Sequence, residues 1–106
     1  MVMCNCIVQA GQIPADTEAA LKSKLNGFTQ RAFGEPAQIN WVAIPEKSGF
    51  TATKPSTSSI VSMRAPKPME QPKREALLRE LGDLWTAETK CSLDEVVSVI
   101  ADPENN

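Results

Sequence analysis

The stretch MVMCNCIVQ, residues 1–9, sets the interpretation of the whole chain. It is short and mostly apolar, and Ala10 and Gly11 end it, which indicates a β-strand that starts at the first residue. A strand in this position puts the α-amino group at the mouth of whatever the strand packs into. Such an amine titrates near neutral pH, with an unperturbed pKa of roughly 7.7–8.0, so it is a candidate reactive group.

Helical and extended patterns alternate after this strand. Two stretches carry apolar residues at helical spacing and predict amphipathic helices. The first is capped by Asp16 and ended by Gly34, and the second runs over about 71–89 with Pro72 in its first turn. Their inward faces are Leu21, Leu25, Phe28 and Ala32 in the first helix and Leu77, Leu78, Leu81, Leu84 and Trp85 in the second. Strands are predicted over 39–44, 59–64 and 96–100, with an exposed loop or loose hairpin over 47–58.

The chain contains an internal repeat. Sliding it on itself by 57 positions aligns the two halves without a gap, so that Leu21 falls on Leu78 and Phe28 on Trp85. The halves span about residues 1–46 and 58–103, and their strands, helices and connections coincide. Two β-α-β units with right-handed crossovers predict an α/β (α+β) fold: a four-stranded mixed sheet with two helices on one face. The other sheet face is left partly apolar and uncovered, which predicts a homo-oligomer.

Length and composition narrow the class of protein. The 106 residues fit a single domain, and a net charge of −2 gives no basic surface for nucleic acid. No apolar run reaches the roughly 18–20 residues of a membrane span and no signal peptide is visible, so we expect a soluble, cytoplasmic protein. Three cysteines without any histidine fall short of a four-ligand zinc site, and we expect neither a metal nor a cofactor. Cys4 and Cys6 share one face of the first strand and are expected to be buried.

Three stretches carry a resemblance to a known family: IVSMR at 60–64, KREALL at 73–78 and SLDEVVSV at 92–99. With the duplicated β-α-β layout, they resemble the two-motif members of the tautomerase superfamily, such as the cis-3-chloroacrylic acid dehalogenases and malonate semialdehyde decarboxylases, over essentially the whole chain. The resemblance implies a trimer with a pocket built around the first strand. In the family, an N-terminal proline acts as general base or general acid, and positive groups after the third strand bind the substrate carboxylate.

This chain departs from the family pattern at the reactive residue. Val2 stands at the position of the proline, and the amine of Met1, where Met1 is kept, is displaced by one residue. A displacement of about 1 Å can cost on the order of a hundredfold in rate. The position of the family histidine is taken by Phe28, the second carboxylate-binding arginine falls near Glu70, and the chain has no tyrosine. We therefore do not expect the dehalogenase mechanism.

Four residues remain as candidates for substrate binding. The resemblance implies that Arg64 and Lys67 hold a carboxylate, the arginine through two parallel hydrogen bonds and the lysine as a point charge. The alternative for this pair is a solvated rim with a salt bridge to Glu70. Phe28 and Trp41 are candidate pocket walls, and core or subunit interface is the alternative for Trp41.

Two functions from different classes follow. The first is a proline-less tautomerase-like enzyme that acts on a small 2-oxo or unsaturated acid. The second is a non-catalytic oligomeric module that binds a small anion or serves in assembly. They differ in whether the pocket beside Val2 is open and positively lined, or filled by Met1, Phe28 and Trp41.

Overall fold

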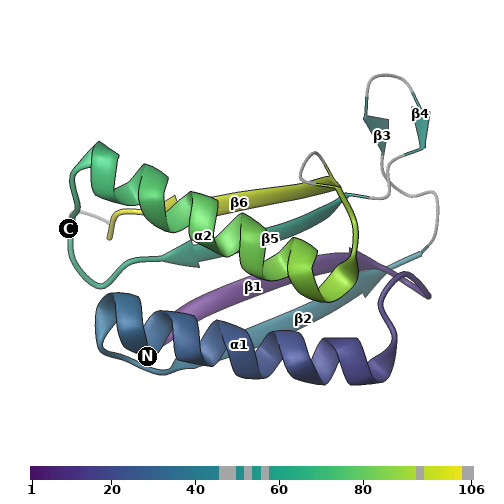
Figure 1. Cartoon of the computed structure of the whole chain (residues 1–106), viewed down its shortest axis with the longest axis horizontal. Coiled ribbons are helices and arrows are strands. Elements are labelled where there is room, and N and C mark those ends of the chain that lie inside the picture. Colours follow the sequence, from purple (N-terminus) through teal and green to yellow (C-terminus); the bar gives the residue numbers. More distant parts are fainter. Residues whose placement is uncertain (46–49, 52–53, 56–57, 93–94, 104–106) are drawn as a thin grey trace.

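The computed structural model describes residues 1–45, 50–51, 54–55, 58–92 and 95–103. The elements follow one another as β1 (Val2–Gln9), α1 (Ala15–Phe33), β2 (Ala37–Ile44), β3 (Phe50–Thr51), β4 (Lys54–Pro55), β5 (Ser59–Arg64), α2 (Gln71–Thr89) and β6 (Val96–Ala101). This is the predicted order, with β5 and α2 at the predicted bounds and β2 two residues longer at its start. The two-residue strands β3 and β4 pair as an antiparallel hairpin inside the predicted loop, and they project from the end of the sheet opposite the N-terminus (Figure 1).

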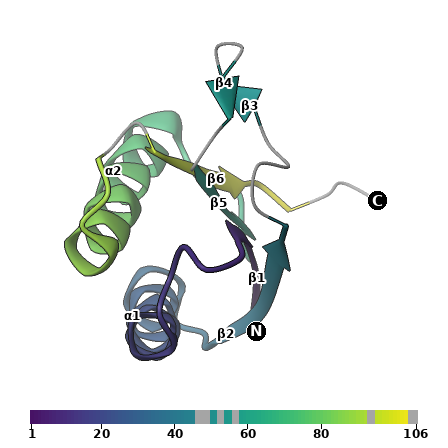
Figure 2. The same ribbon diagram turned by 90° about the vertical axis from the view of Figure 1, so that its right-hand side faces the viewer.

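The main sheet has the strand order β2-β1-β5-β6. Each β-α-β half forms a parallel pair, β1 with β2 and β5 with β6, and the two halves join through the antiparallel pair β1–β5. Both helices cover the same face of this sheet (Figure 2). The predicted fold, a mixed four-stranded sheet with two helices on one side, is confirmed.

The core lies between the sheet and the helices. Alternate residues of β1 point into it, and Val2, Cys4 and Cys6 are all buried there. The helices contribute the predicted stripes, of which Leu21, Leu25 and Phe28 in α1 and Leu81 and Trp85 in α2 are fully buried. Burying these side chains contributes roughly 1.5–3 kcal/mol each, which fixes the strand register and the side on which the helices pack.

The helix ends differ from the sequence prediction at one cap. Asp16 was expected to cap α1, but the N-cap is Pro14 and no side chain caps this end. Asp16 lies in the first helical turn, where its carboxylate accepts a hydrogen bond from the Thr17 N–H. Its negative charge also interacts favourably with the positive end of the helix dipole. The C-terminal end is as predicted, because Gly34 takes the left-handed conformation with φ 73°.

The uncovered face of the sheet carries an apolar row that crosses all four strands. The strand registers place Val42 beside Ile7, Ile7 beside Ile60, and Ile60 beside Val97. Three of these side chains are at least a third exposed, with Val97 at 49%. The structure therefore has the partly apolar, helix-free face that the sequence predicted.

Candidate functional site

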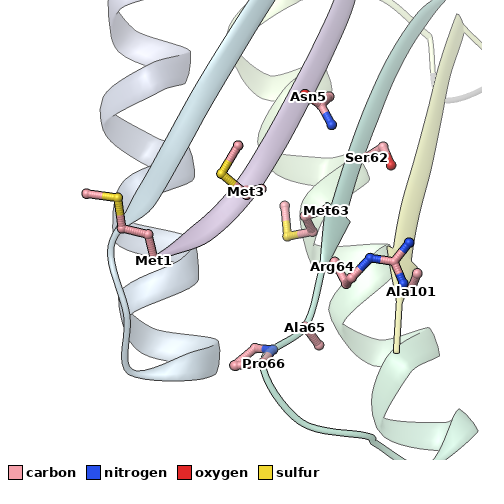
Figure 3. A pocket seen from close by; sticks show the side chains of 9 residues that line it. All are labelled: Met1, Met3, Asn5, Ser62, Met63, Arg64, Ala65, Pro66 and Ala101. Atoms are coloured by element: carbon pink, nitrogen blue, oxygen red, sulfur yellow. The ribbon is translucent and has the colours of Figure 1, made fainter. Parts of the chain in front are cut away.

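The start of β1 meets the end of β5 at one end of the sheet. These strands are antiparallel, with Cys4 opposite Met63, so the first residues of the chain lie beside the segment that leaves β5. A pocket of about 340 Å³ is present there (Figure 3). We call it the N-terminal pocket, and its lining residues are Met1, Met3, Asn5, Ser62, Met63, Arg64, Ala65, Pro66 and Ala101.

Arg64 supplies the positively charged side chain among the residues that line the N-terminal pocket. It is the last residue of β5, and its Nη1 donates a hydrogen bond of 2.9 Å to the main-chain carbonyl of Asp102. Met1, Met3 and Ala65 add apolar surface to the wall, and Asn5 and Ser62 add polar surface. A planar guanidinium in such a setting is suited to a carboxylate, which it can bind through two parallel hydrogen bonds.

A second pocket, of about 390 Å³, shares the lining residue Pro66 with the first. We call it the loop pocket, because the β5–α2 connection forms one wall and the end of α1 forms the other. It is lined by Ala32, Phe33, Gly34, Glu35, Pro66, Lys67, Pro68, Met69 and Lys73. Arg64 and Lys67 were expected to share one carboxylate, but they line these two neighbouring pockets separately. The loop pocket also contains Lys73, which the sequence analysis did not select.

The first two residues are held by different groups. The Met1 ammonium donates to Glu35 Oε1 over 2.8 Å, whereas the Met1 side chain is exposed. Val2 is 1% exposed, and its N–H donates to the carbonyl of Pro36 at 2.9 Å. Val2 is therefore a buried residue of β1, and the Met1 amine at this end of the strand is paired with Glu35. Glu35 was missed by the sequence analysis, because its partner is 34 residues away.

Phe28 and Trp41 lie outside both pockets. Phe28 is 1% exposed and packs edge-on against Phe33, with ring centroids 6.2 Å apart. Trp41 stacks on Trp85 at 5.9 Å, and the ammonium of Lys22 lies 5.5 Å from its ring. Both side chains belong to the layer between sheet and helices, so the core alternative describes Trp41, and neither is among the residues that line the N-terminal pocket or the loop pocket.

Arg74 in α2 and Asp102 after β6 form an ion pair next to the end of the β5–α2 connection. Arg74 Nη2 is 2.6 Å from Asp102 Oδ1, and the same oxygen accepts a hydrogen bond from the Met69 N–H at 3.3 Å. The hydrogen bond from Arg74, supported by the one from Met69, lowers the pKa of Asp102 below its ordinary value. Arg74 lies in the stretch 73–78 that the sequence analysis noted, but nothing in the sequence indicates that it pairs with Asp102 across 28 positions.

Cys4 and Cys6 lie in the core and line neither the N-terminal pocket nor the loop pocket. Cys4 and Cys6 are fully buried with their Sγ atoms 4.0 Å apart, as their shared strand face predicts, and all three cysteines are free. The hydrogen bond with Cys4, together with burial, raises the pKa of Cys6, which disfavours its thiolate. Within the described ranges, no three Cys, Asp or Glu side chains come together as metal ligands. Neither helix in the part of the chain that the structure describes is long and apolar enough to cross a bilayer.

Comparisons with known proteins agree on the fold. Searches against protein-family models and against curated protein sequences gave no match. Among solved structures, native Ps01740 superposes with a TM-score of 0.86 at 22% identity, over 95% of this chain and 93% of that one. N1, a member of the cis-3-chloroacrylic acid dehalogenase family, gives 0.85 at 12% identity, over 95% and 74% of the two chains. A fused 4-OT, solved as a symmetric trimer, gives 0.82 at 17% identity, over 95% and 85%. These matches confirm the fold that the resemblance implied.

Proposed function

We propose that this chain is a tautomerase-superfamily protein that lacks the N-terminal proline and has weak or non-standard activity on a small 2-oxo or unsaturated carboxylic acid. The N-terminal pocket carries the proposal, since Met1 and Arg64 line one hollow at the end of β1. Its volume of about 340 Å³ lies in the range typical of small-molecule sites, about 300–1,000 Å³. The cytoplasmic location and the absence of a cofactor are parts of the same proposal.

Each residue has a defined role in this proposal. Arg64 binds the substrate carboxylate, and Lys67 adds positive charge from the loop pocket. The amine of Met1, or a water held by the two cations, moves the proton between carbon and oxygen. An ammonium that is paired with Glu35 cannot accept a proton until it has given one away, which is the physical reason to expect weak activity. Phe28 and Trp41 support the layer beneath β1 and contact no substrate.

The direct test is an assay of phenylpyruvate and 2-hydroxymuconate tautomerisation across pH, with wild type and Arg64→Ala. Loss of a hydrogen-bonded charge typically costs about 1.5–3 kcal/mol, so kcat/KM should fall roughly 10- to 100-fold. Arg79→Ala is the matched control, because Arg79 is exposed on α2 and lines neither pocket. Turnover no faster than in buffer, or turnover that Arg64→Ala leaves unchanged, would remove the enzyme proposal.

The missing proline suggests a second, constructive test. Val2→Pro, with Met1 removed, places a secondary amine where the family has its reactive group. If the N-terminal pocket is otherwise competent, this variant should gain activity relative to a Val2 protein that is also trimmed of Met1. Absence of any gain, in a variant that retains the wild-type fold by circular dichroism, would show that more than the base is missing.

A non-catalytic module is the second candidate, and the Met1–Glu35 ion pair favours it. An amine engaged at 2.8 Å by a carboxylate is poorly placed to act as a base. A small carboxylate would then bind at Arg64 and leave unchanged. Calorimetric titration with phenylpyruvate distinguishes the two candidates, because binding that Arg64→Ala abolishes, without turnover, supports the module, and binding with turnover supports the enzyme.

We further propose that the protein is a homotrimer built on the uncovered sheet face. The apolar row from Val42 to Val97 gives this face a surface that water solvates poorly. The fused 4-OT with the same fold was solved as a trimer. Ile60→Lys puts a charge in the middle of the row and should convert the assembly to monomer in light scattering. Ser23→Lys, on the exposed side of α1, adds the same charge and should leave the mass unchanged.

A further inference from the structure

Arg74 makes more contacts than a surface arginine. It lies in the first turn of α2, and its side chain is only 19% exposed. Its Nη1 donates to the carbonyl of Ile100 at 3.3 Å, and its Nη2 donates to the carbonyl of Met69 at 3.2 Å and to the Asp102 carboxylate at 2.6 Å. One guanidinium thus joins the start of α2, the end of the β5–α2 connection and the end of β6.

Asp102 connects Arg74 to the N-terminal pocket through hydrogen bonds. Its carboxylate is held by Arg74 and by the Met69 N–H, and its main-chain carbonyl accepts the hydrogen bond from Arg64 at 2.9 Å. The adjacent Ala101 carbonyl accepts from the Ala65 N–H at 2.8 Å. Arg64 is therefore oriented by a residue that Arg74 holds in place, although no direct contact joins the two arginines among the described hydrogen bonds.

We propose that Arg74 is a positioning residue for the N-terminal pocket: through Asp102 it orients the Arg64 guanidinium, and through Met69 it fixes the connection that carries Lys67. Only the predicted effect of Arg74 on substrate affinity rests on the proposed function. The restraint itself is a property of the folded chain.

The chemistry of arginine explains why this position needs more than a positive charge. A guanidinium is a rigid planar fork that can satisfy several acceptors at once, whereas an ammonium is a compact charge on a flexible stem. The ion pair with Asp102 is partly exposed, so its direct contribution to global stability is small. A change in the orientation of Arg64 should consequently appear in substrate affinity before it appears in the unfolding free energy.

Arg74→Lys and Arg74→Met test the proposal, with Arg79→Lys as control on the exposed face of the same helix. Arg74→Lys should raise KM for phenylpyruvate about tenfold, the effect of losing one charge-assisted hydrogen bond, while kcat changes much less. Arg74→Met should raise it further. A tenfold fall in kcat with KM unchanged would overturn the positioning role. A change in KM no larger than that caused by Arg79→Lys would overturn it as well.

Amide hydrogen exchange at Met69 provides a readout that does not depend on activity. Its N–H is held by the Asp102 carboxylate, so Arg74→Met should speed its exchange about tenfold or more relative to amides in the middle of α2. If wild type neither binds nor converts phenylpyruvate, the proposed function fails. The exchange rate at Met69 still shows whether Arg74 restrains Asp102 and the β5–α2 connection. Unchanged exchange at Met69 in Arg74→Met would overturn the restraint whatever the enzyme assay shows.

Discussion

The two ends of the sheet are related by the internal repeat, yet they differ greatly in open space. At the end that holds Met1, the two pockets measure about 340 and 390 Å³. At the opposite end, where β5 begins, a hollow of only about 30 Å³ lies among Gln12, Ile13, Ser59, Trp85, Thr89, Cys91 and Glu95. The repeated backbone therefore provides two similar positions for a site, and among the described residues the larger pockets lie at the Met1 end.

Four cationic side chains at or beside the larger pockets have no cationic counterpart in the repeat. These cations are Arg64, Lys67, Lys73 and Arg74. Residues 57 positions earlier in the repeat are Ile7, Ala10, Asp16 and Thr17, so every cation has an uncharged or acidic counterpart. Size follows the same division, because the fully buried Trp85 lines the closed hollow, whereas its counterpart Phe28 lines neither open pocket. A duplicated fold can thus place cationic side chains in one half that have no cationic counterpart in the other.

The largest effect is expected from emptying the closed end. Trp85→Ala removes a fully buried ring and should destabilise the protein by about 3–5 kcal/mol, measured by urea unfolding. Trp85→Phe is the milder control, since the indole Nε1 donates no hydrogen bond within the described residues and only ring volume is lost. A cost below about 1 kcal/mol for Trp85→Ala would mean that Trp85 does not fill this end in solution, because typical Trp truncations cost several times more.

A smaller effect, of opposite sign in the two halves, is expected at the helix ends. Gly34 ends α1 with φ 73°, and Lys90 ends α2 with φ 65°. A Cβ at Gly34 would meet no atom within 4 Å, so Gly34→Ala suffers only backbone strain and should destabilise by about 1 kcal/mol. Lys90→Gly relieves the same strain and should stabilise by about 0.5–1 kcal/mol. Thermal and urea unfolding of both variants measure these changes in stability. If both variants were stabilised, or both destabilised, the two helix ends would not be equivalent.

The elements of both halves were predictable because their signals are local. Apolar spacing and Pro72 gave α2 at its observed bounds, and Gly34 marked the end of α1. The repeat then indicated the four-stranded mixed sheet with both helices on one face. Asp16 was misplaced as a cap because a first-turn acid and an N-cap acid look alike in sequence, while the observed cap, Pro14, has no side-chain acceptor.

The site was less predictable because its groups pair across long stretches of sequence. Arg64 was selected through the family resemblance, but the residues that hold it and the amine, Asp102 and Glu35, are 38 and 34 positions from their partners. Phe28 was a candidate through its position in the family pattern, and Trp41 was a possible pocket wall with the core as its alternative. Phe28 packs against Phe33 and Trp41 against Trp85, in the layer between sheet and helices. Periodicity identifies a buried face and does not distinguish the core from a pocket wall.

The Arg74–Asp102 ion pair should make stability depend on pH. The other half of the repeat has Thr17 at the position of Arg74, and threonine cannot form an ion pair. Arg74 lowers the pKa of Asp102 below the ordinary value of 3.8, so this carboxylate favours the folded state once it is ionised. The contribution is present above the unfolded pKa and is lost as the pH falls through the lowered folded pKa. Asp102→Asn should therefore be less stable than wild type by a constant margin at pH 5–8, and the margin should shrink below about pH 3.8. Urea unfolding from pH 7 to about pH 2.5 measures it, and a margin independent of pH would assign the loss to packing rather than charge.

The smallest effect is expected from moving charge to the closed end. Ala10→Lys with Asp16→Lys introduces counterparts of Lys67 and Lys73 at two exposed positions. We expect no new phenylpyruvate binding in calorimetry, because a hollow of about 30 Å³ has room for about one water and not for an aryl acid. The same two substitutions in Arg64→Ala test whether added positive charge elsewhere on the surface can replace the arginine, and binding should stay as weak as in Arg64→Ala alone. Restored binding would show that net charge, rather than an open pocket with an oriented guanidinium, decides which end of the repeat holds the carboxylate.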